Sequence, residues 1–285
     1  MPEFFVGIGA QKCASTWLYQ ILSDHPEVSL SATKELDFFS HWYNRGYQWY
    51  ERHWTLTPSV LAFGEVSPSY FCEPGVPERI KSYNPKARIL LSLRDPVDRA
   101  ISNHLHEIRV GHLKGPDLSF EFGLRNNPMY LEQSRYGYHL SRWIRAFPIE
   151  QILILFMDDI ETDPREVETR VQQFLGIATG HRSAALADRS NVGRLYRFHR
   201  INQARKAVRR IVKRLGLDPV WKQAQAAGLQ KIYRRLNWRP TTEVMAPVSC
   251  ETRDRLREQL VDDIRLLESI SGRSLENWIL GSAKS

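Results

Sequence analysis

The chain has 285 residues, of which 42% are hydrophobic, 25% charged and 11% aromatic. This composition excludes a disordered chain, a collagen-like repeat, a coiled coil and a disulfide-stabilised miniprotein, and the length suffices for a large hydrophobic core. The formal net charge of +8 is unevenly distributed along the chain, because residues 189–239 contain fifteen Lys and Arg and a single acid, Asp218. The rest of the chain is therefore mildly acidic, and the basic segment is expected to meet an anionic partner.

The N-terminus and the cysteines favour a cytoplasmic protein. Residues 1–3 (MPE) lead directly into a short apolar run that is too short, and too acidic at its start, for a signal peptide. No window approaches 18 consecutive apolar residues, so no membrane-spanning helix is expected. Cys13, Cys72 and Cys250 match no C-x-x-C or zinc-binding spacing, which is typical of a reducing compartment.

The N-terminal residues predict a strand, a loop of small residues and a helix. Residues 4–8 are a short apolar run typical of a buried strand, and residues 16–23 follow as an amphipathic helix. The pair His25-Pro26 ends this helix. A strand, a small-residue loop and a helix in this order open a phosphate-binding α/β domain. The residues expected on the buried helical face are Trp17, Leu18, Ile21 and Leu22.

Two more buried strands alternate with helices further along the chain. Asp95 is expected to cap the helix after the second strand, with Pro96 as its first residue, and Asp163-Pro164 is expected to start a later helix in the same way. This alternation predicts an α/β fold with a central parallel β-sheet flanked by helices. The predicted strands are 88–93 and 152–157, and the predicted helices are 97–109, 138–147 and 164–175.

The C-terminal third has a different pattern. Apolar residues recur at helical spacing between Lys and Arg over 198–215 and 221–236, which predicts two basic amphipathic helices. We expect a single domain over 1–285, with 190–240 as a basic helical insertion or lid within it. Residues 250–285 are expected to supply a C-terminal helix that packs on the core.

The loop after the first strand has the residues of an anion site. Backbone N–H groups and a helix N-terminus form a concave site there, to which Lys12, Ser15 and Thr16 add side-chain donors. The alternative is an ordinary strand-to-helix turn that needs small residues only for packing. A nucleotide kinase would need G-x-x-x-x-G-K-[ST], but Gln11 precedes Lys12 and Cys13 follows it, so the magnesium-binding hydroxyl is missing from its place. Asp158 could pass for a Walker B carboxylate, although an Asp after a strand more often caps the next turn.

Three segments together resemble the sulfotransferases that use 3′-phosphoadenosine 5′-phosphosulfate (PAPS). GAQKCASTWL, from residue 9, resembles the family's 5′-phosphosulfate loop, and RILLSLRDPVDRAIS, residues 88–102, is similar to its 3′-phosphate element. TKELDFF, residues 33–39, resembles the K-E-x-x-F-F segment of the heparan-sulfate and bacterial branch. Residues 65–71 and 136–143 are similar to further segments of that branch. The implied fold is the P-loop NTPase-like sulfotransferase fold.

The resemblance also implies roles for individual residues. Lys12 would neutralise the oxygen that bridges sulfur and the 5′-phosphate, and Glu35 would be the general base, with Phe38 and Phe39 anchoring its loop. His104 is a reserve base. The expected PAPS-binding residues are Gln11, Lys12, Cys13, Ala14, Ser15 and Thr16 at the 5′-phosphate, Arg94 and Ser102 at the 3′-phosphate, and Arg194 in a closing loop.

The loop departs from the family's usual K-x-G-T-T, because Ala14 replaces the Gly and Ser15 the first Thr. Alanine costs little if its φ stays negative, whereas a positive φ would strain it. The resemblance therefore supports phosphate binding by this loop more firmly than it supports the loop's detailed geometry.

The expected reaction is sulfuryl transfer from PAPS to a hydroxyl or amine of a glycan, lipid or small molecule, with 3′-phosphoadenosine 5′-phosphate (PAP) as product and no metal. An ATP-dependent kinase and a basic nucleic-acid-binding protein are the alternatives, the latter because aromatic side chains interleave with Arg over 189–239. A basic amphipathic helix more often covers a core or lies on an anionic membrane. We therefore expect no nucleic-acid partner, and we expect that 190–240 attaches the protein peripherally to the inner face of a membrane or selects the acceptor.

Overall fold

The computed structural model describes residues 2–113, 115, 118–184, 194–196, 238–240 and 245–281. It divides the chain into two compact units: residues 1–100, 128–190 and 250–285 form the first, and residues 101–127 and 191–249 form the second. Both basic helices expected over 198–215 and 221–236 lie outside the described residues, and the expected single domain stays a prediction. Within the described part, no helix is both long and apolar enough to cross a membrane.

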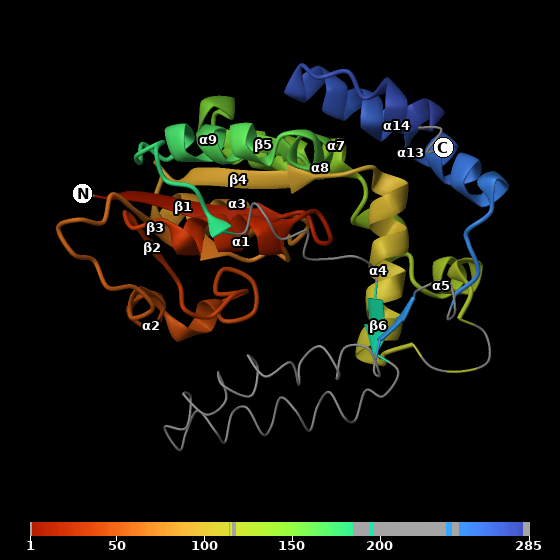
Figure 1. Ribbon diagram of the computed structural model, residues 1–285, viewed down its shortest axis with the longest axis horizontal. Coiled ribbons are helices and arrows are strands. Elements are labelled where there is room, and N and C mark those ends of the chain that lie inside the picture. Colours follow the sequence, from red (N-terminus) through yellow and green to blue (C-terminus); the bar gives the residue numbers. More distant parts are fainter. Residues whose placement is uncertain are drawn as a thin grey trace. The chain divides into compact units, whose positions relative to one another are not determined.

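The first unit is built on a parallel sheet of five strands in the order β2-β3-β1-β4-β5 (Figure 1). The predicted α/β class is thereby confirmed. The sequence analysis missed two strands, because β2 is three residues long and β3 (AFGEV) interrupts its apolar residues with Gly and Glu. The strands are β1 (Glu3–Gly9), β2 (Val28–Leu30), β3 (Ala62–Val66), β4 (Arg88–Leu93) and β5 (Ile152–Phe156).

Local sequence signals set most of the helix boundaries. The Asp95 carboxylate accepts a hydrogen bond from Asp98 N at 2.8 Å, so Asp95 caps α4 as predicted. Asp163 caps α9 through Arg165 N and Glu166 N, both at 3.1 Å. The helices of the first unit are α1 (Ser15–Asp24), α2 (Tyr47–Glu51), α3 (Val76–Tyr83), α6 (Met129–Glu132), α7 (Tyr136–Ala146), α8 (Met157–Thr162), α9 (Pro164–Phe174), α13 (Cys250–Ser271) and α14 (Glu276–Leu280), and α4 (Pro96–Val110) starts there.

Two boundaries differ clearly from the prediction. α7 begins at Tyr136 rather than at residue 138. The strand predicted over 152–157 ends at Phe156, and Asp158, which was expected to cap a turn, lies in α8, which begins at Met157. The C-terminal helix α13 packs against α7, and its Asp263 carboxylate accepts hydrogen bonds from Gly137 N at 2.9 Å and Tyr138 N at 2.8 Å. The second unit contains the rest of α4, α5 (Phe120–Asn126) and the antiparallel pair β6 (Arg194–Tyr196) and β7 (Trp238–Pro240).

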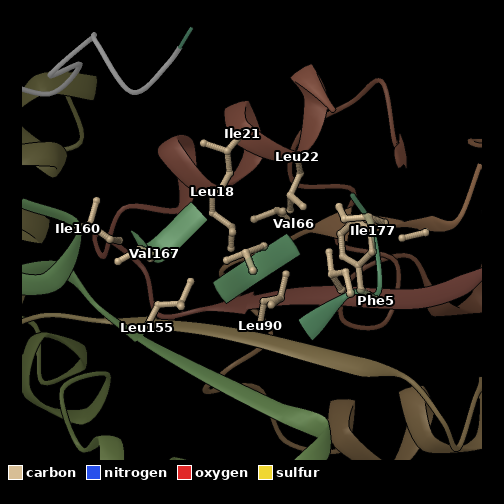
Figure 2. Close-up of a cluster of buried hydrophobic side chains, with 13 residues drawn as sticks. Phe5, Leu18, Ile21, Leu22, Val66, Leu90, Leu155, Ile160, Val167 and Ile177 are labelled. Carbon is tan, nitrogen blue, oxygen red and sulfur yellow. The ribbon is translucent and has the colours of Figure 1, made fainter. Parts of the chain in front are cut away.

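One cluster of the hydrophobic core lies between the sheet, α1 and α9 (Figure 2). Leu18, Ile21 and Leu22 of α1 are buried against strand residues that include Phe5 and Leu90, while Trp17 packs against the edge of the cluster. Each fully buried Leu or Ile contributes about 1.5–3 kcal/mol. This packing fixes the start of α1, and with it the loop that precedes α1.

Gly64 of β3 marks a close approach of β3 to β1, because a Cβ there would lie 1.9 Å from the carbonyl oxygen of Phe5. We expect Gly64→Ala to lower the free energy of unfolding by about 3 kcal/mol, since β1 and β3 must separate to admit the methyl group. Urea unfolding measures this loss. Gly180→Ala is the matched control, because a Cβ at Gly180 meets nothing within 4 Å. Equal urea midpoints for the two variants would contradict this prediction.

Candidate active site

The candidate site lies at the carboxyl ends of three neighbouring strands. β1 pairs with both β3 and β4, so the segments that follow these strands leave the sheet at the same edge. They are the loop over 10–14, the segment from Ser67 and the turn at Arg94-Asp95. The tertiary structure thus brings together three of the segments that carry the family resemblance.

Ser92 of β4 anchors the loop after β1. Its backbone carbonyl accepts a hydrogen bond from Ala10 N at 2.8 Å, and its hydroxyl donates to Gly9 O at 3.1 Å and to Cys13 O. Ser92 is buried, and it is the one polar residue between the hydrophobic residues of the strand RILLSL. The sequence analysis missed this function, although a lone Ser in an apolar strand was the signal for it.

The loop keeps a strained backbone at its centre. Lys12 has φ 68° and Ala14 has φ 62°, so the alanine that replaces the family's glycine adopts the left-handed conformation that strains it. Such strain tends to occur at ligand sites. Ala14 also occupies the N-cap of α1, where no side chain caps the helix among the described residues. The N–H groups of the first turn, which start at Ser15 and Thr16, are therefore suited to a bound anion.

Arg94 lies beside this loop. Burial raises the pKa of the Cys13 thiol, while the Tyr136 hydroxyl, 3.5 Å from its Sγ, and the nearby positive charge of Arg94 act in the opposite direction. Arg94 is also 3.6 Å from Asp98, whose other oxygen accepts a hydrogen bond from Arg253 at 2.8 Å. A small pocket that Arg94 lines is rich in carboxylates and does not suit a phosphate, so a phosphate would bind Arg94 on its Cys13 side.

Lys34 joins the segment over 33–39, here the Glu35 loop, to the segment over 10–16, here called the phosphate loop after its expected ligand. Its Nζ donates hydrogen bonds to Glu35 Oε1 at 2.8 Å and to Thr16 Oγ1 at 3.2 Å. The expected base and the first turn of α1 are therefore one side chain apart. Phe38 and Phe39 are both fully buried, as expected for anchors of this loop. This bridge could not be predicted from the motif that contains Lys34, since only the fold brings residues 16 and 34 together.

Asp37 adds a second carboxylate to the Glu35 loop. Burial raises the pKa of Asp37, the Ser69 hydroxyl that donates to its Oδ1 at 2.5 Å lowers this pKa, and the charge of Glu35 raises it. Gln11 and Lys12 are half-buried in the phosphate loop. In the described part of the chain, no group of three or more His, Cys, Asp or Glu is placed to hold a metal ion.

Three expected site residues belong to the second unit. Ser102 lies half-buried on α4. His104 is fully buried, with Nε2 3.0 Å from Leu118 O and its ring edge-on to Phe120, so packing within the unit explains its position. Arg194 begins β6, and its side chain lies outside the described residues. Their roles stay predictions.

The chain is similar to curated heparan sulfate sulfotransferases. Mouse bifunctional heparan sulfate N-deacetylase/N-sulfotransferase 4 is 33% identical over 202 residues, which cover 62% of this chain and 22% of the relative. Mouse heparan sulfate glucosamine 3-O-sulfotransferase 3B1 is 32% identical over 187 residues, which cover 62% of this chain and 46% of the relative. The chain thus spans less than half the length of these curated relatives.

Among solved structures, a sulfotransferase from Alicyclobacillus acidocaldarius matches 98% of both chains with a TM-score of 0.68 and 22% identity, which shows a shared fold. The family model of the sulfotransferase domain matches residues 3–191. This matched region contains the phosphate loop, Lys34, Glu35 and Arg94, the residues that meet at the carboxyl edge of the sheet. The chain therefore belongs to the sulfotransferase domain family.

Proposed function

We propose that the protein transfers a sulfuryl group from PAPS to a hydroxyl or amine by in-line displacement. The observation that carries this proposal is the Lys34 bridge, which holds Glu35 against the first turn of α1. A donor anion at the helix N-terminus and an acceptor at Glu35 would then be neighbours. Family membership supports the same reaction.

The residues of the loop suit the 5′-phosphosulfate end of PAPS. The first-turn N–H groups of α1 and the hydroxyls of Ser15 and Thr16 supply hydrogen-bond donors, and Lys12 supplies a positive charge. Arg94 would hold the 3′-phosphate, for which its forked guanidinium is well shaped, and the role of Ser102 at the same phosphate stays a prediction from the sequence. PAPS supplies the activated sulfuryl group, and the protein contributes orientation and electrostatic stabilisation.

In this proposal, a residue of the site assists the formation of the new bond, and another assists the breaking of the old one. The new bond forms between sulfur and the acceptor oxygen or nitrogen, and the acceptor proton passes to the Glu35 carboxylate. The bond between sulfur and the bridging oxygen breaks, and its electron pair stays on the 5′-phosphate of PAP. Lys12 stabilises the negative charge that develops on that oxygen, as in phosphoryl transfer.

A glycan is the first acceptor class to test, because the relatives are named for heparan sulfate and its glucosamine. Lipids and small molecules are the other classes. We further propose that the basic residues over 190–240 select an anionic acceptor or bind the inner face of an anionic membrane from the cytoplasm. We expect no nucleic-acid partner.

Nucleotide binding separates this proposal from its alternatives. PAP at about 100 times its dissociation constant should add about 2.7 kcal/mol to the stability, which raises the Tm by about 5 °C, whereas ATP should not. A mass-shifted sulfate assay from PAPS on glycans, glycolipids and phenols then tests transfer. Stabilisation by ATP alone would favour a kinase, and salt-dependent RNA or DNA binding without PAP affinity would favour the nucleic-acid-binding alternative.

A further inference from the structure

The backbone of the Glu35 loop adopts an unfavourable conformation that depends on contacts with the surrounding structure. Glu35 has φ 61° and Asp37 has φ 53°, so two non-glycine residues close together adopt the left-handed conformation. Each such residue costs on the order of 1 kcal/mol or more and persists only where surrounding contacts impose it. The contacts that impose this conformation therefore decide where the Glu35 carboxylate lies.

The end of β3 and the segment after it supply these contacts to every second N–H group of the loop. Glu35 N donates to the Val66 carbonyl at 3.2 Å. Asp37 N donates to Ser67 Oγ at 3.0 Å, and Phe39 N donates to the Tyr70 hydroxyl at 3.0 Å. Two of these three acceptors are side-chain hydroxyls, whose orientation depends on their own partners.

Glu65 orients both hydroxyls. Ser67 Oγ donates to Glu65 Oε2 at 2.6 Å, and Tyr70 Oη donates to Glu65 Oε1 at 2.9 Å. Because each hydroxyl has one proton and directs it to the carboxylate, its lone pairs face the backbone N–H groups of the Glu35 loop. One buried carboxylate of β3 thus sets the direction of two hydrogen bonds to the loop.

A buried carboxylate is a costly residue for a sheet. Burial and the charge of Asp37 raise the pKa of Glu65 and the hydroxyls of Ser67 and Tyr70 lower it, with a net pKa of about 7. An apolar residue here would avoid the cost of desolvating a charge. The hydrogen bonds that Glu65 directs to the loop explain why a carboxylate is present at this buried position.

We propose that Glu65 is a positioning residue, which fixes the Glu35 carboxylate for proton abstraction through Ser67 and Tyr70. This inference rests on the proposed function of Glu35 as the base. Glu65 itself is fully buried beneath the loop and need not touch the donor or the acceptor.

Glu65→Gln tests the proposal, because an amide keeps the volume but presents one acceptor oxygen and one donor nitrogen. One hydroxyl then has to turn its proton away from residue 65, which weakens its bond to the loop. We expect kcat for sulfate transfer to fall about tenfold or more, with the KM for PAPS within about twofold, since small misplacements of reacting groups cost up to about a hundredfold. Ser67→Ala and Tyr70→Phe should act in the same direction.

Tyr83→Phe is the matched control. The Tyr83 ring also packs on Phe39, with centroids 5.8 Å apart, and its hydroxyl also donates to a carboxylate, Glu51 at 3.5 Å. It makes no hydrogen bond to the backbone of the Glu35 loop among the contacts of the described residues. The Tyr83→Phe enzyme should keep its kcat within about twofold, because only hydroxyls that accept from the loop orient it.

A double-mutant cycle with Glu35→Gln separates positioning from general damage to the fold. If Glu65 acts through Glu35, adding Glu65→Gln to Glu35→Gln should cost no further activity. Amide hydrogen exchange at Asp37 and Phe39 should become faster in Glu65→Gln whether or not an acceptor is known. Should Glu65→Gln fail to fold, Tyr70→Phe takes its place in the cycle.

The outcomes distinguish the two proposals. A wild-type protein that transfers no sulfate contradicts the proposed function, whatever the exchange rates show. An active wild type whose Glu65→Gln variant keeps its kcat, or loses it equally with and without Glu35, overturns the positioning role. Unchanged amide exchange at Asp37 and Phe39 overturns it as well.

Discussion

Replacement of Lys12 by Ala is expected to lower kcat for sulfate transfer about a thousandfold. As sulfur leaves the bridging oxygen, negative charge grows on that oxygen, and a fixed cation there stabilises the transition state more than the ground state. Lys12 belongs to the loop that Ser92 anchors between Gly9 and Cys13, so its backbone is held before any ligand binds. A preorganised charge costs little reorganisation free energy when the substrate binds. We therefore expect the largest loss of activity from the substitution of Lys12.

The measurement is single-turnover transfer from PAPS, with the PAP-induced shift in Tm as a test of binding. Lys12→Ala should keep a PAP-induced shift, because the N–H groups of α1 and Arg94 remain. Lys86→Ala removes an exposed lysine elsewhere on the first unit and should leave kcat unchanged. A Lys12→Ala enzyme with more than about a tenth of wild-type turnover would contradict the role of Lys12.

Glu35→Gln is expected to lower kcat by about a hundred- to ten-thousandfold and to change PAP affinity little. A positioned general base contributes a factor of that size, and an amide cannot take the proton of the acceptor. The amide oxygen can still accept the hydrogen bond from Lys34 that now goes to Glu35 Oε1, so the link to Thr16 should survive.

Steady-state turnover and PAP titration separate the two effects of this variant. Glu73→Gln, at an exposed glutamate, is the control for the loss of one negative charge. Near-normal turnover of Glu35→Gln would remove Glu35 as the base. His104 would then have to leave its contact with Leu118 O to serve, and His104→Ala would show whether it does.

Several parts of the site could be predicted from the sequence because their signals are local. The loop around Lys12 and the cap at Asp95 each follow a mostly apolar strand and precede an amphipathic helix. A capping side chain and helical periodicity act over a few residues, so one stretch of chain contains the whole signal. The family resemblance then supplied roles for Glu35 and Arg94 that these patterns alone do not contain.

Other parts were decided only by contacts between distant segments. Lys34 reaches Thr16, and the Glu35 loop is held by Ser67 and Tyr70, some thirty residues further along the chain. In the sequence, Glu65 is an ordinary acid in a short stretch with few apolar residues. Only the folded sheet shows that it lies beneath that loop.

The sequence by itself therefore determined the α/β class, the strand, loop and helix around Lys12 and the position of Arg94 at the end of a strand. The tertiary structure alone decided that Ala14 is left-handed, that Ser92 anchors the loop, and that Glu65 and Lys34 hold the Glu35 loop. The reason is physical. Capping and periodicity are local energies that a short segment expresses on its own, whereas backbone strain and buried hydrogen bonds persist only where folding brings their partners together.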